Sequence, residues 1–200
     1  PALPGLTESD APMGEALGSV FGLKRVQEMF NLHDVVRRVV ATVDNLPREK
    51  VAPRLMPAKP VPGRMQPTGN EENRLLNAQN SARYLPAVRV IESVDAGKLV
   101  AIYVRYYAWF QQAYKELGYP NGYFNDRLIE VIDHLLAAPE LKAPIRLVQH
   151  KVLYEFADAE LEARSAGQKI IMRIGAENAR RVKAKLREIR REVSGQLPKK

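Results

Sequence analysis

Side chains able to do chemistry are concentrated in residues 118–136, which read GYPNGYFNDRLIEVIDHLL. Aromatic rings, amides and a guanidinium on a turn are groups with which proteins bind glycans and peptides, by stacking and hydrogen bonding. The candidate binding residues are Tyr119, Asn121, Tyr123 and Arg127. The same stretch also suits a purely structural corner, in which Pro120, Asn121 and Gly122 form a tight turn and the rings pack around it.

Acidic residues after this turn suggest two other kinds of chemistry, metal binding and glycoside hydrolysis. On a helix, Asp126, Glu130, Asp133 and His134 lie opposite the apolar face and therefore toward solvent. A metal site of this kind needs a second helix with similar ligands, and glycoside hydrolysis needs an acid in a dry pocket. The sequence shows neither arrangement, so we predict no metal site and no catalytic residue here.

Other catalytic patterns are also missing from the sequence. There are no cysteines, and the three histidines, His33, His134 and His150, are widely separated. No serine has the surroundings of a nucleophile elbow, and no Gly-rich turn carries the Lys and Ser or Thr that bind phosphates. We therefore predict no cofactor and favour a non-enzymatic function.

The excess of positive over negative charge lies entirely in the C-terminal region, residues 164–200. This region holds 12 Lys or Arg against 3 Glu, whereas the net charge of the whole chain is +8. Such asymmetry predicts contact with an anionic partner. The candidate contact residues are Arg180, Arg181, Lys183, Lys185, Arg187, Arg190 and Arg191.

Three interpretations of this basic segment remain open. Residues 174–189, IGAENARRVKAKLREI, have some likeness to a helix-hairpin-helix element that binds nucleic acid. A narrow apolar stripe flanked by cations also suits a helix on an anionic membrane or an acidic partner. Since no bulky aromatic residue anchors the stripe, we favour the third interpretation, in which the helix packs on its own domain.

Helical periodicity and capping residues predict a mainly α protein. The expected helices cover about 10–22, 26–30, 34–45, 82–94, 95–117, 125–137 and 177–193, with two shorter pieces capped by Asp158 and Ser165. Nine of the fourteen aromatic residues fall between Tyr103 and Phe124. Most of those in the 95–117 helix share one face, which is more typical of core packing than of a sugar platform.

Two segments depart from the helical pattern. Residues 47–70 are rich in proline, so we expect an extended segment that either wraps the surface or links two lobes. Residues 145–156 alternate in polarity, which indicates a short β-hairpin, with a frayed helix as the alternative. We therefore expect a bundle-like single domain over residues 9–200, preceded by the end of a tether at 1–8.

Several longer stretches resemble one family, the bacterial domain of unknown function 3014. They are ATVDNLPREKVAPRLMPAKPVPGRM (41–65), YFNDRLIEVIDHLLAAPE (123–140), KVLYEFADAELEARSAGQKIIMRIG (151–175) and ENARRVKAKLRE (177–188). The resemblance implies an N-terminal membrane anchor and a Pro- and Ala-rich tether upstream of this domain, of which PALPGL would be the end. It also implies a location at the inner membrane, on the periplasmic side, and it supplies no catalytic residues.

From these observations we expect a non-catalytic binding or scaffolding domain of a membrane-tethered envelope protein. Its partner would be a protein, another envelope component or an anionic membrane surface. Two alternatives remain, an envelope enzyme acting on glycan or peptide near Tyr123 and Asp126, and a nucleic-acid-binding domain that uses residues 174–191.

Overall fold

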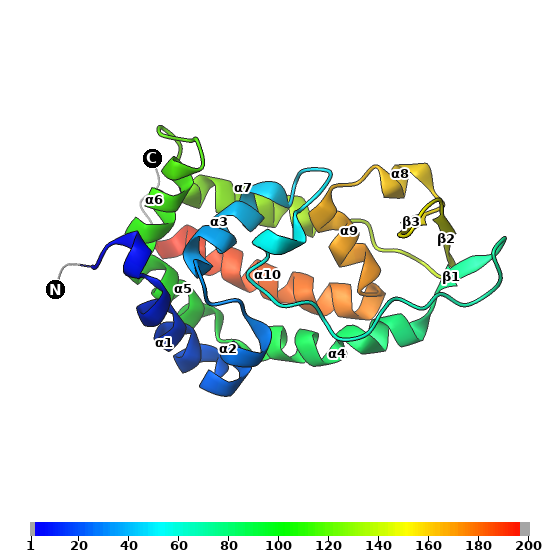
Figure 1. Cartoon of the computed structure of the whole chain (residues 1–200), viewed down its shortest axis with the longest axis horizontal. Coiled ribbons are helices and arrows are strands. Elements are labelled where there is room, and N and C mark those ends of the chain that lie inside the picture. Colours follow the sequence, from blue (N-terminus) through cyan, green and yellow to red (C-terminus); the bar gives the residue numbers. More distant parts are fainter. Residues whose placement is uncertain (1–2, 197–200) are drawn as a thin grey trace.

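A computed structural model describes residues 3–196 of the chain, apart from the side chain of Gln196. Within that range it contains ten α-helices and one small antiparallel sheet (Figure 1), which confirms the prediction of a mainly α bundle with a short hairpin. The helices are α1 (Asp10–Phe21), α2 (Leu23–Met29), α3 (Val35–Asn45), α4 (Ala78–Ser93), α5 (Ala96–Arg105), α6 (Tyr107–Glu116), α7 (Phe124–Leu136), α8 (Ala159–Glu162), α9 (Ala166–Arg173) and α10 (Ala176–Gln196). The strands are β1 (Arg74–Leu76), β2 (Ile145–Gln149) and β3 (Tyr154–Phe156), and two 3-10 turns cover η1 (Leu6–Glu8) and η2 (Pro53–Leu55). None of these helices is long and apolar enough to cross a membrane in the part of the chain described.

The basic helix α10 is the central helix of the bundle. It packs against α4, α5 and α7 along its length, and Figure 1 shows it running through the middle of the molecule. Val193 in its last turns is completely buried, and Ile189 and Leu186 pack into two of the hydrophobic clusters. The apolar stripe of this helix therefore packs on its own domain, which is the third of the three interpretations of the segment.

The aromatic residues form the main core, as predicted, but on two helices instead of one. Tyr103, Trp109, Phe110 and Tyr114 are buried, and the ring of Phe110 stacks on that of Phe124 with centroids 5.9 Å apart. The expected helix over 95–117 is broken at Tyr106, whose backbone has φ −104° and ψ 16°. The break redirects α6, and the indole nitrogen of Trp109 donates a 2.8 Å hydrogen bond to the carbonyl of Pro4.

The described part of the expected tether end, residues 3–8, is mostly exposed and contacts this core through Leu6 and the carbonyl of Pro4. Leu6 in η1 is buried among the core residues, next to α6. The carboxylate of Asp10 then accepts hydrogen bonds from the backbone nitrogens of Asp34 and Val35, at 2.8 and 3.1 Å. A residue of α1 thus caps the start of α3, while Asp34 itself has a positive φ of 51° and makes no side-chain cap.

The Pro-rich segment, residues 47–70, wraps the helices. Backbone bonds connect it to the end of α2: Asn31 N donates to Pro57 O and Lys59 N to Met29 O, both at 2.7 Å. Further along, Arg83 of α4 donates to Gly63 O at 2.6 Å. The segment therefore wraps the surface and does not link two lobes. Side chains and backbone of neighbouring helices bind its carbonyls.

The sheet has the order β1-β2-β3, and both pairings are antiparallel. The pairing of β2 with β3 is the predicted hairpin, with Leu147 opposite Phe156. Strand β1 was not predicted; its Arg74 lies opposite Leu147, so the loop before β1 runs alongside the end of the hairpin. Figure 1 places this sheet at the end of the molecule far from the N-terminus.

Candidate functional site

Two of the four candidate binding residues at the corner are bound to a buried carboxylate of the protein itself. Asp44, in the last turn of α3, is only 2% exposed. Its Oδ1 accepts from Arg127 Nε at 3.0 Å, and its Oδ2 accepts from Arg48 Nη2 at 2.7 Å and from the Tyr119 hydroxyl at 3.2 Å. Arg127 Nη2 also donates to the carbonyl of Asp44 at 2.9 Å. The geometry therefore joins α3, the turn and α7 at one point.

The pKa of the Arg127 guanidinium is raised at this point. Burial by itself lowers it, but the hydrogen bond to Glu130 and the charges of Asp44 and Glu130 outweigh that effect. Arg127 therefore stays charged and neutralises the buried carboxylate. Tyr119 is further held by stacking on Tyr114, with ring centroids 4.6 Å apart.

The other two candidates lie on the surface of the same corner. Asn121 is exposed in the turn, and Tyr123 is 50% exposed just before α7. Helix α7 begins one residue before the predicted start at 125, and its first backbone N–H, that of Phe124, donates to Oε1 of Gln111 in α6 at 2.9 Å. The amide nitrogen of Gln111 also donates to Gly122 O at 2.7 Å, so Gln111 holds both sides of the turn.

Sequence analysis missed Asp44, although a signal for it exists. Val36 and Val40 are buried on one face of α3, and the next position at helical spacing is 44. An acidic residue on an apolar stripe has to find a cationic partner, because an unpaired buried charge is costly. The pattern thus predicts a partner, but not that Arg127 supplies it.

The basic residues of α10 are divided between the interior and the surface. Lys183 and Lys185 are buried: Lys183 Nζ donates to Ala138 O at 2.5 Å and Lys185 Nζ to Val94 O at 2.8 Å. These carbonyls lie at or just beyond the C-terminal ends of α7 and α4, where the helix dipole favours a positive charge. Two of the predicted contact residues therefore stabilise helix ends inside the bundle.

Two arginines of α10 form ion pairs with neighbouring helices. Arg181 binds Glu92 of α4, and Arg190 binds Asp133 of α7 through two hydrogen bonds at 2.5 and 2.8 Å. The hydrogen bond from Arg181 lowers the pKa of Glu92, and the one from Arg190 lowers the pKa of Asp133. Both pairs tie α10 to the helices on either side of it.

The remaining cations of α10, Arg180, Arg187 and Arg191, are exposed and recur at helical spacing on its solvent face. Arg180 lies 3.3 Å from Glu177, and Arg191 lies 4.0 Å from Glu192. Lys199 and Lys200 of the predicted basic region lie outside the described residues. The outward-facing part of the predicted anionic contact is thus much smaller than the charge count suggested.

The structure brings together one pair of residues that sequence spacing did not connect. His134 Nε2 lies 2.7 Å from the hydroxyl of Ser165, a contact of the kind that activates serine nucleophiles. The same hydroxyl, however, accepts from Gln168 N at 3.2 Å and caps α9, as predicted for Ser165. Within residues 3–196 no cluster of three or more His, Asp or Glu is arranged to hold a metal ion.

The most exposed large hydrophobic residues described lie at the end of the hairpin. Val152 and Leu153, between β2 and β3, are 82% and 75% exposed. We call residues 150–153 the hairpin tip. Beside it lies an open hollow of about 940 Å³, to whose lining His150 of the tip contributes together with Glu155, Glu162 and Lys169.

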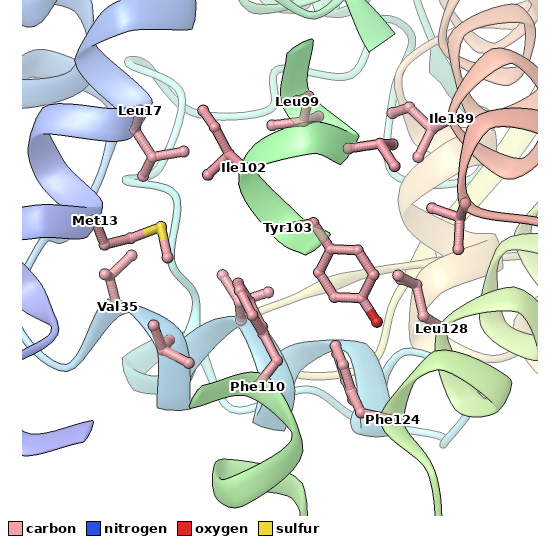
Figure 2. A pocket seen from close by; sticks show the side chains of 14 residues that line it. Met13, Leu17, Val35, Leu99, Ile102, Tyr103, Phe110, Phe124, Leu128 and Ile189 are labelled. Carbon is pink, nitrogen blue, oxygen red and sulfur yellow. The ribbon is translucent and has the colours of Figure 1, made fainter. Parts of the chain in front are cut away.

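An apolar cavity of about 200 Å³ lies within the helical bundle. Figure 2 shows the side chains that surround it, which come from α1, α3, α5, α6, α7 and α10. The lining residues are Met13, Leu17, Val35, Val36, Val39, Leu99, Val100, Ile102, Tyr103, Phe110, Phe124, Leu128, Ile189 and Val193.

Comparison with known proteins gives one family. A family model described as a protein of unknown function, DUF3014, matches residues 35–190. No curated protein and no solved structure matches the chain.

Proposed function

Since the chain belongs to the DUF3014 family, for which no function is known, we propose its function from the geometry. We propose that it is a non-catalytic, protein-binding scaffold domain of a membrane-tethered bacterial envelope protein. The observation that carries this proposal is the exposure of Val152 and Leu153 at the hairpin tip, 82% and 75%. Two adjacent aliphatic side chains on a projecting tip favour a partner that buries them.

The charges around the hairpin tip favour a protein partner over an anionic membrane. Lys151 and His150 belong to the tip, and both are exposed. The register of β1 with β2 brings the loop containing Glu71 and Glu72 to the same end of the sheet. Cations and anions around an apolar centre are typical of protein interfaces, whereas anionic lipids would repel the two glutamates.

The hollow beside the hairpin tip gives a partner a concave surface in addition to the exposed tip. His150 and Val148 belong to both the hairpin and the hollow, and Glu162 and Lys169 lie deeper, 2.8 Å from each other. A partner segment that covers Val152 and Leu153 can therefore continue into this hollow, whose lining is part polar and part apolar. A membrane tether would support such binding, because attachment to the same surface raises the effective concentration of the partner.

Crosslinking in the native envelope tests this proposal. A photoreactive residue at Val152 of the full-length protein is expected to give a discrete protein adduct, which Leu153→Asp abolishes. A photoreactive residue at Ile91, an exposed hydrophobic residue of α4, serves as the matched control and is expected not to give this adduct. An adduct with lipid alone, or one insensitive to Leu153→Asp, would refute the proposal.

The two alternative functions are supported less well by the described contacts. The enzyme proposal needs an acid that is free to react. Among residues 3–196 the one buried acidic side chain is that of Asp44, and Arg127 and Arg48 neutralise it. Nucleic-acid binding through residues 174–191 would have to rely on Arg180, Arg187 and Arg191, because the other cations of that helix bind carbonyls or carboxylates of the domain.

A further inference from the structure

The apolar cavity is unsuited to water and to polar ligands. A buried water molecule typically needs two to four polar partners. Among the fourteen lining residues only Tyr103 has a polar side-chain group, and its hydroxyl is directed at Asn125 Oδ1, 3.4 Å away on α7. The interior surface therefore offers aliphatic and aromatic groups and the thioether of Met13 to an occupant.

We propose that this cavity binds an uncharged hydrocarbon group, an alkyl chain or small ring of about eight carbon atoms. The size follows by proportion, since an apolar cavity of about 150 Å³ in another protein takes benzene, with six carbons. A volume of about 200 Å³ then holds roughly eight. This site is independent of the hairpin tip and goes beyond the proposed scaffold function.

One side of the cavity lies close to the surface. Six of the lining residues are only half-buried, and four of them, Leu17, Leu99, Ile102 and Ile189, lie on the same side of the cavity in Figure 2. The other two are Val39 and Leu128. The opposite side is formed by the fully buried Val35, Phe110 and Phe124. An alkyl chain can therefore enter from the side of α1, α5 and α10 and leave a polar head group in solvent.

Methyl-resolved NMR of the full chain tests the site directly, with octan-1-ol and benzene as probes. Saturable shifts are expected for the methyl groups of Leu17, Val36 and Val100, while those of Val26 and Val131, buried outside the cavity, stay unchanged. Octane-1,8-diol is expected to bind at least about tenfold more weakly, because its second hydroxyl would be buried without a partner. Saturation by octanol assigns a chain and saturation by benzene alone assigns a ring.

A pair of substitutions provides the control. Val100→Phe puts a benzene-sized ring where the cavity has room, so it is expected to keep the fold and to abolish the probe shifts. Val131→Phe is made at an equally buried position that does not line the cavity, and is expected to lower the melting temperature. The proposal is overturned if neither probe shifts the lining methyl groups, if the control valines shift equally, or if Val100→Phe lowers the melting temperature as much as Val131→Phe does.

Discussion

Asp44 lies where α3, the turn after α6 and α7 meet, and its oxygens accept from Arg127, Arg48 and Tyr119. Replacing both partners of a buried ion pair by apolar residues often leaves the stability unchanged. Removing only one partner is strongly destabilising, because the other charge is then buried without compensation. Tyr119 and Arg127 therefore have a structural role, whatever else the corner does. Tyr123 and Asn121 lie on the surface, so a binding role of the corner is best tested at these two positions.

The first prediction concerns the arginines around Asp44. Arg127→Met keeps the aliphatic part of the side chain but removes the donor to Oδ1 and to the carbonyl, and is expected to cost about 3 kcal/mol of unfolding free energy. Arg48→Met, at a position whose side chain is largely exposed, is expected to cost less than about 1 kcal/mol. Urea unfolding measures both, and equal losses would contradict the central position of Arg127.

A second residue-scale prediction concerns Glu162 beside the hollow. Burial raises the pKa of its carboxyl. The hydrogen bonds from Lys169 and Phe156 N and the charges of Lys169 and Arg173 outweigh that effect, so the pKa lies below its ordinary value of 4.5. A lowered carboxyl pKa contributes stability that is complete above the ordinary value and is lost as the pH falls through the folded-state value.

Glu162→Gln is therefore expected to cost about 1.5–3 kcal/mol at pH 7, the range for hydrogen bonds to charged groups. The same substitution should flatten the fall in stability below about pH 4.5. Urea midpoints measured between pH 3 and pH 7 check both effects. If the stability of the variant fell with decreasing pH as steeply as that of the wild type, Glu162 would not contribute to the loss of stability in acid.

At the scale of elements, α10 shows why charge content does not predict exposure. Its composition is strongly basic, yet it forms the centre of the bundle, because Lys183 and Lys185 bring their ammonium groups to carbonyls at the ends of α7 and α4. Their long aliphatic stems can be buried while the charged group is satisfied. The sequence shows the lysines, but which carbonyls lie opposite them depends on the packing of helices far away in the chain.

The third prediction distinguishes the two kinds of cation on α10. Lys183→Met is expected to lower the unfolding free energy by about 1–3 kcal/mol, since the carbonyl of Ala138 would lose its donor in a buried position. Arg187→Met, on the solvent face, should change it by less than about 0.5 kcal/mol. Thermal unfolding followed by circular dichroism gives the comparison. If both variants were neutral, Lys183 would not be a structural residue.

The helices themselves were largely predictable, because their signals are local. Asp95 caps α5, Ser165 caps α9, and Gly118, with φ 113°, follows the end of α6, all as their residue types indicated. Two features were not predictable from local pattern. The break at Tyr106 interrupts an otherwise continuous helical periodicity, and β1 is three residues long and pairs with a strand about seventy positions later.

At the scale of the whole molecule, the outward cations of α10 limit how strongly this helix can bind a polyanion. If Arg180, Arg187 and Arg191 were the contact to duplex DNA, neutralising three phosphates would give a slope of log K against log salt of about −3. Reversing all three charges should flatten the slope. Fluorescence anisotropy between 50 and 200 mM salt measures this slope. A slope near −6 would require that all seven predicted contact residues of α10 bind phosphates, which would contradict the internal role of Lys183 and Lys185.

The Pro-rich segment is held to the end of α2 and to α4 by hydrogen bonds at Pro57, Met29 and Gly63. A single protease cut between its anchoring points would therefore leave two fragments that stay associated through the bundle. Co-expression of a fragment ending in this segment with one beginning after it should then restore a folded heterodimer, which gel filtration can detect. The loop thus offers a natural place to divide the protein into a reporter with two complementing halves.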